Sequence, residues 1–105
     1  MIARLSVYGN VDLDLADRVK AWFEGEGAGL YDDIPGYRGS MTLVDRENAR
    51  VVGIGFYATA GHAAEADALI AERTAGALEQ LAQAERDALS TPPESVGLYE
   101  VVHRD

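Results

Sequence analysis

The sequence predicts an α+β fold of element order βαββαβ, the ferredoxin-like arrangement of a four-stranded antiparallel sheet with two helices on one face. Three observations support this: four short stretches that alternate apolar and polar residues, two longer stretches with apolar residues at helical spacing, and a short polar link between the middle strands. Right-handed crossovers would then place both helices on the same side. Residues 1–105 have the length of one ordinary domain, so we expect a single domain.

The first part of the chain predicts a strand followed by an amphipathic helix. Ile2–Tyr8 alternates, with Arg4 and Ser6 opposite the apolar residues, which is typical of a half-buried strand. Asp12 and Asp14 can cap a helix, because carboxylates accept from the free N–H groups of a first turn. The apolar residues at helical spacing are Leu15, Val19, Trp22 and Phe23. Glycines then end the helix, at Gly25, Gly27 and Gly29.

The middle of the chain predicts a hairpin and then a long helix. Tyr37–Asp45 and Arg50–Ala58 alternate as strands, and the link between them is so short that they should pair antiparallel. Thr59 or Gly61 can cap the helix that follows, and the stretch 91–93 with its two prolines ends it. Its apolar positions are Ala66, Leu69, Ile70, Ala77, Leu78, Leu81 and Ala84.

Charge and composition argue against several classes of function. The chain has 9 Lys and Arg against 18 Asp and Glu, a net charge of −9, which repels nucleic acids and anionic membrane surfaces. It has no Cys, so thiolate catalysis and thiolate metal ligation are excluded. The sequence shows no signal peptide or membrane span, and a cytoplasmic location is expected.

Apolar residues on both faces of the central strands predict a homodimer. In the third strand Val52, Ile54 and Phe56 share one face, while Val51 and Tyr57 share the other. The last strand, Val96–Val102, repeats this pattern. Helices cover only one face of such a sheet, so a second copy of the sheet is the simplest cover for the other.

Three stretches resemble the dimeric α/β-barrel superfamily, and within it the antibiotic-biosynthesis-monooxygenase-like (ABM-like) group. They are Pro35–Ser40 at the start of the second strand, Leu43–Arg46 before the hairpin turn, and Val52–Thr59 with its aromatic residue before the long helix. The resemblance implies a dimeric α/β barrel. It also implies either a cofactor-free monooxygenase or a protein that binds a small apolar or aromatic molecule between sheet and helices. The His and Asn positions typical of haem-degrading members have no counterpart here, so we expect no cofactor.

Gly53, Gly55 and Tyr57 mark the candidate site, because alternate residues of a strand share a face. With the phase implied by the resemblance, that face is toward the helices. Two missing side chains leave either a pocket rimmed by Tyr57 or room for close packing by helix alanines. Those alanines are Ala63, Ala66 and Ala77. Further candidate ligand contacts are Tyr8, Tyr99 and Trp22.

Tyr57 and His62 are the candidate catalytic residues, His62 as a general base, since imidazole titrates near neutral pH. No second His is near enough in sequence to suggest a metal site, and none is predicted. The alternative to a ligand-binding or monooxygenase function is a non-catalytic dimeric module that engages another protein.

Overall fold

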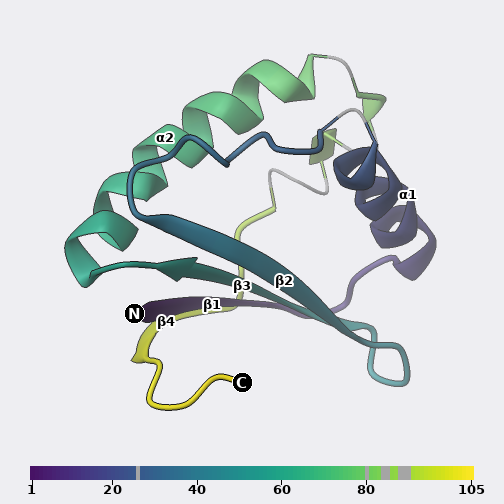
Figure 1. Cartoon of the computed structure of the whole chain (residues 1–105). Coiled ribbons are helices and arrows are strands. Elements are labelled where there is room, and N and C mark those ends of the chain that lie inside the picture. Colours follow the sequence, from purple (N-terminus) through teal and green to yellow (C-terminus); the bar gives the residue numbers. More distant parts are fainter. Residues whose placement is uncertain (26, 80, 84–85, 88–90) are drawn as a thin grey trace.

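The computed structural model describes residues 1–25, 27–79, 81–83, 86–87 and 91–105. Its sheet is antiparallel throughout, with the strand order β2-β3-β1-β4. The strands are β1 (Ile2–Tyr8), β2 (Tyr37–Asp45), β3 (Arg50–Tyr57) and β4 (Ser95–Glu100). Both helices, α1 (Leu13–Glu24) and α2 (Ala60–Leu78), lie on one side of it (Figure 1). The α+β fold is thus confirmed, and its strand order is compatible with a ferredoxin-like fold.

Side-chain caps fix where both helices begin. The Asp12 carboxylate accepts from the backbone N–H of Leu15 at 3.1 Å, as the sequence predicted. Of the two caps considered for α2, Thr59 is the one used, because its Oγ1 accepts from the backbone N–H of His62 at 3.1 Å. Each cap satisfies an N–H that has no partner within its own helix.

The prediction of one helix reaching as far as residue 91 is wrong, because α2 ends at Leu78. Glu79 lies in a turn and Leu81 in a bend, so the chain leaves the helix axis there. Gly76 lies in the last turn, and glycine is the poorest helix former after proline. Ala84 lies outside the described residues. The last strand also ends earlier than predicted, at Glu100 instead of Val102.

The buried core lies where α2 meets the end of β3. It consists of four residues that are each at most 3% exposed: Ile34, Tyr57, Ala63 and Ala66. The two alanines carry so little side chain that α2 can approach the sheet closely over Tyr57. Ile34 comes from residues 27–36, which we call the strap, because this segment runs along α2 before β2 begins (Figure 1). Helix α1 has no fully buried residue.

The other face of the sheet is only partly covered, by the tail after β4. Residues 101–105 turn back beneath the sheet (Figure 1). The Arg104 guanidinium carbon lies 4.4 Å from the centre of the Phe56 ring, a cation–π contact. Phe56 is 8% exposed there.

Among the described helices, none is long and apolar enough to cross a membrane.

Candidate functional site

A hollow of about 170 Å³ lies on the helix side of the sheet, around the two glycines of β3. A Cβ atom built on Gly53 would meet no atom within 4 Å, so the space above it is open. A Cβ atom on Gly55 would lie 3.0 Å from both the ring and the hydroxyl oxygen of Tyr57. The ring of Tyr57 therefore covers Gly55, and its hydroxyl points along the strand toward the open space.

The two alternatives for this face, a pocket or close helix packing, both occur, but over different residues. Ala63 and Ala66 pack in the same buried cluster as Tyr57. Neither fills the space above Gly53, which remains open. The side chain of Ala77, the third alanine considered, lies outside the described part of the chain. The glycine-marked face is thus closed at the Tyr57 end and hollow at the Gly53 end.

Polar residues of the neighbouring strands surround the two glycines. On one side, Arg4 and Ser6 of β1 are the register partners of Gly55 and Gly53. On the other side, Ser40 and Thr42 of β2 are their partners. Register partners in an antiparallel sheet point to the same face, so these four side chains border the glycines. All four line the hollow.

Tyrosines form the wall of the hollow. The rings of Tyr31, Tyr37 and Tyr57 follow one another, with centroids 6.4 and 6.0 Å apart and near edge-to-face geometry. The Tyr31 hydroxyl also hydrogen-bonds the Thr74 hydroxyl of α2 at 2.9 Å, which holds the strap against the helix. The ring centroids of Phe23 of α1 and Tyr31 are 6.3 Å apart, so Phe23 connects α1 to this row of rings.

The charged groups at the site are Arg4 and its partner Asp67. The Arg4 Nε lies 3.3 Å from a carboxylate oxygen of Asp67 on α2, and the Arg4 side chain is 28% exposed. Burial raises the pKa of the Tyr57 phenol, while the positive charge of Arg4 opposes part of that rise. Tyr57 is therefore a neutral phenol near pH 7, able to donate a hydrogen bond but not to act as a base.

The structure brings four of the predicted site residues together and leaves three elsewhere. Gly53, Gly55, Tyr8 and Tyr57 all line the hollow, whereas His62, Trp22 and Tyr99 do not.

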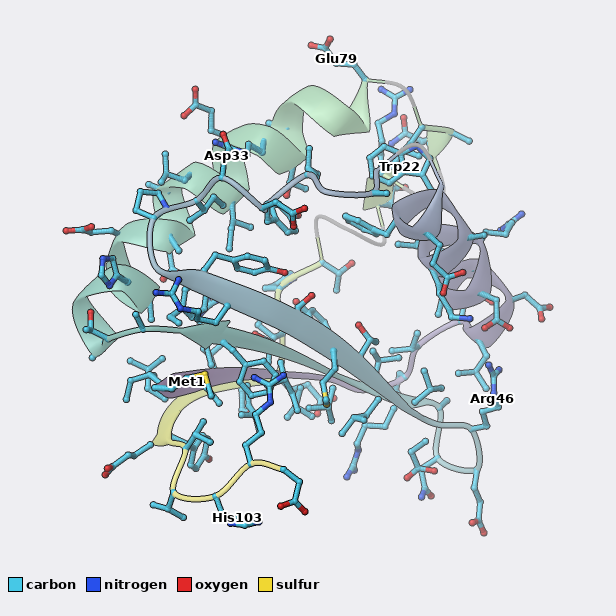
Figure 2. All side chains as sticks on the ribbon, in the orientation of Figure 1. Met1, Trp22, Asp33, Arg46, Glu79 and His103 are labelled. Atoms are coloured by element: carbon cyan, nitrogen blue, oxygen red, sulfur yellow. The ribbon has the colours of Figure 1, made fainter. Side chains whose placement is uncertain are left out.

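The three residues outside the hollow have other surroundings. Tyr99 is 58% exposed and pairs with Ala3, so it lies on the opposite face of the sheet. The His62 Nδ1 lies 2.9 Å from the Thr59 hydroxyl at the start of α2. Trp22 packs edge-to-face against Phe23, beyond the tyrosines, and Figure 2 shows it beside α1 above the sheet.

Sequence reasoning did not identify Arg4 and Ser6 as site residues. The alternation of β1 places them together on the polar face of a half-buried strand, and such a face commonly meets water. Ser6 is in fact only 9% exposed. The signal that could have found them is their pairing with Gly53 and Gly55, because a polar face beside glycines can border a cavity instead of solvent.

No protein-family model matches the chain, and no curated protein or solved structure does either. Within the described residues, no three His, Asp or Glu side chains gather closely enough to hold a metal ion. The geometry of the hollow is therefore the main indication of function.

Proposed function

We propose that the chain binds a small apolar or aromatic molecule in the hollow between β3 and the strap. The observation that supports this best is the open space above Gly53, beneath a wall of tyrosine rings. A concave, partly apolar site with a few convergent polar groups is the usual form of a small-molecule site. Tyrosine rings suit a flat apolar ligand, because they offer a large rigid surface and a hydroxyl at its edge.

The size of the hollow favours a ligand of about one ring. Its volume of about 170 Å³ is below the roughly 300–1,000 Å³ of sites for drug-sized molecules. It is close to the volume, about 150 Å³, of an engineered apolar cavity in another protein that takes up benzene. A ligand of several fused rings would exceed this volume.

Binding is better supported than oxidation. A cofactor-free monooxygenase of the ABM-like group would have to deprotonate its substrate so that the resulting carbanion reacts with oxygen. Among the described lining residues the ionisable side chains are Arg4 and tyrosines. Burial raises the pKa of Tyr57 and Tyr31, so neither is a base near pH 7. Oxidation accordingly remains a prediction from the resemblance alone.

The alternative of a protein-interaction module has one observation in its favour, on the other face of the sheet. Met41, Leu43 and Tyr99 are 45%, 51% and 58% exposed there. Exposed apolar groups on a strand face commonly mark contact with another protein. We propose that this face pairs with a second copy of the chain, so that the homodimer and the ligand site use opposite faces of one sheet.

Gly53→Val tests the ligand site, because a Cβ at this position meets no atom within 4 Å and the valine side chain would therefore enter the hollow and reduce its volume. We expect one-ring aromatic compounds to shift amide NMR signals around the hollow in the wild-type chain. The same compounds should not shift the amide signals of Gly53→Val. The free energy of unfolding of this variant should be unchanged or raised by about 0.5–1 kcal/mol, since valine favours a strand and restricts the unfolded chain.

Gly76→Ala is the matched control, because Gly76 also has nothing within 4 Å of a built Cβ but lies on α2 away from the hollow. It should bind ligands as the wild type does. If aromatic compounds bind Gly53→Val as well as the wild type, the hollow is not the site. If a broad panel fails to bind the wild type, the proposed function is wrong.

A further inference from the structure

The floor of the hollow contains donors of hydrogen bonds that no described residue accepts. Arg4 stands beside Gly55, and the hydroxyl of Tyr57 lies directly over the same glycine. The guanidinium and the phenol therefore approach each other at the edge of the open space above Gly53. Ser6 stands next to them in the same row, as the partner of Gly53.

Arg4 has most of its bonding capacity left. A guanidinium carries five N–H donors and no acceptor. Its Nε faces Asp67, and within the described part of the chain the two Nη atoms make no hydrogen bond. The fork of the two Nη groups matches a carboxylate, which accepts two parallel hydrogen bonds. A partly buried cation that lines a cavity and keeps these donors without an acceptor is a suitable partner for an anion.

The described residues that line the hollow include no carboxylate. The chain has 18 Asp and Glu residues, yet none is among the described residues that line the hollow, and Arg4 is the one charged side chain there. The negative charge of the whole protein slows the approach of anions, but salt screens it beyond about 10 Å. The nearest carboxylate is Asp67, which pairs with the Nε of Arg4, so an anion at the floor would bind the two remaining Nη groups against the repulsion of Asp67.

We infer that the ligand of this hollow is an aromatic carboxylate of about one ring, whose carboxylate Arg4 binds while the tyrosine wall holds its ring. This rests on the proposed function, since it assigns a chemical class to the ligand of the same site. The Tyr57 hydroxyl, kept neutral by burial, donates to the same carboxylate. Asp67 keeps the Arg4 side chain extended toward α2 and so positions it.

The test compares benzoate with benzamide, which has the same shape but no charge. NMR titration of the wild-type chain should give benzoate about 10-fold or more the affinity of benzamide, because a hydrogen bond to a charged partner is worth a factor of this order. Acetate, which has the carboxylate without the ring, should bind more weakly than benzoate. These three measurements need no variant.

Arg4→Gln should reduce benzoate affinity about 10-fold or more and benzamide affinity much less, because benzamide loses a neutral hydrogen bond where benzoate loses a charged one. The benzoate affinity of Arg4→Lys should lie between those of the wild type and Arg4→Gln, because lysine keeps the positive charge but lacks the planar fork of donors. Arg50→Gln, an exposed arginine of β3 that does not line the hollow, is the matched control and should bind benzoate as the wild type does.

The outcomes separate this inference from the proposed function. Equal binding of benzoate and benzamide by the wild type, or undiminished benzoate binding by a folded Arg4→Gln chain, would overturn the carboxylate assignment and leave the aromatic site standing. Failure of both compounds to bind would count against both. Loss of benzoate binding in Arg50→Gln as well would show a general charge effect and also overturn the role of Arg4.

Discussion

Gly36 and Gly39 stand at the entry to β2 with positive φ angles, +76° and +99°. Both have a backbone conformation that side chains disfavour, but they differ in what a side chain would meet. A Cβ on Gly36 would collide with the His62 ring, while one on Gly39 would meet nothing within 4 Å. His62, predicted as a catalytic base, thus packs against the turn that leads into β2.

This pair allows backbone strain and steric overlap to be measured separately. We expect Gly39→Ala to destabilise the fold by about 1–2 kcal/mol from its φ angle alone. Gly36→Ala should cost about 1–3 kcal/mol more, because the His62 ring must also move. Urea unfolding of both variants measures the difference. The overlap involves the Cβ of His62 as well as its ring, so the rescue variant is His62→Gly, which removes both. Relative to His62→Gly alone, most of that extra cost should disappear in Gly36→Ala combined with His62→Gly, and an unchanged cost would show that His62 is not its source.

At the scale of elements, the strap is held on α2 by ionic and neutral contacts. The Arg73 guanidinium donates to the Leu30 carbonyl oxygen at 3.0 Å and pairs with the Asp33 carboxylate. Figure 2 shows Asp33 on the strap where it passes α2. Because the strap also carries Tyr31, these contacts hold one wall of the candidate ligand site in place.

The pairing with Arg73 makes the attachment of the strap sensitive to acid. The hydrogen bond from Arg73 lowers the pKa of Asp33 below its ordinary value of 3.8. A carboxyl whose folded pKa is lowered contributes stability above its unfolded pKa, and this contribution is lost as the pH falls through the folded value. Asp33→Asn should therefore weaken folding at neutral pH and flatten the decline of stability below pH 3.8.

Unfolding by urea at a series of pH values measures this effect. Asp32→Asn is the control, because Asp32 is the neighbouring carboxylate of the strap and makes no ion pair with a described residue. A decline with the same slope in Asp33→Asn and the wild type would show that Asp33 does not set the acid sensitivity.

The elements that sequence could predict are those with a local physical signal. The Asp12 cap and the β2–β3 hairpin depend on residues close together in the chain, and both were predicted correctly. The end of α2 was missed, because alanine-rich sequence continues past Leu78 without a strong stop. The site was found only in part: Gly53 marked its floor, but the role of Arg4 depends on register across two strands, which the sequence alone does not specify.

At the scale of the whole molecule, the sheet exposes large apolar residues on both faces. Leu43 of β2 and Leu98 of β4 are each 51% exposed. Leu43 pairs with Val52 and faces away from the helices, whereas Leu98 pairs with Arg4 and faces the helix side. The tail covers Phe56 in the middle of the former face and leaves Leu43 and Met41 beside it uncovered.

The equal exposure of these two leucines makes them a matched pair for testing the proposed homodimer. Light scattering of the wild-type chain should give twice the protomer mass of 11.3 kDa. Leu43→Lys should give the mass of one protomer, because a buried lysine without a partner is strongly unfavourable in an interface. Leu98→Lys makes the same chemical change on the helix side and should remain dimeric.

The net charge of −9 per chain adds a second expectation, since two such chains repel each other and salt screens the repulsion. The dimer of the wild type should therefore tighten as salt is added, while Leu43→Lys stays monomeric over the same range. A wild-type mass of one protomer at every salt concentration would contradict the dimer. Dissociation by Leu98→Lys instead of Leu43→Lys would place the interface on the helix side, where it would compete with the ligand site.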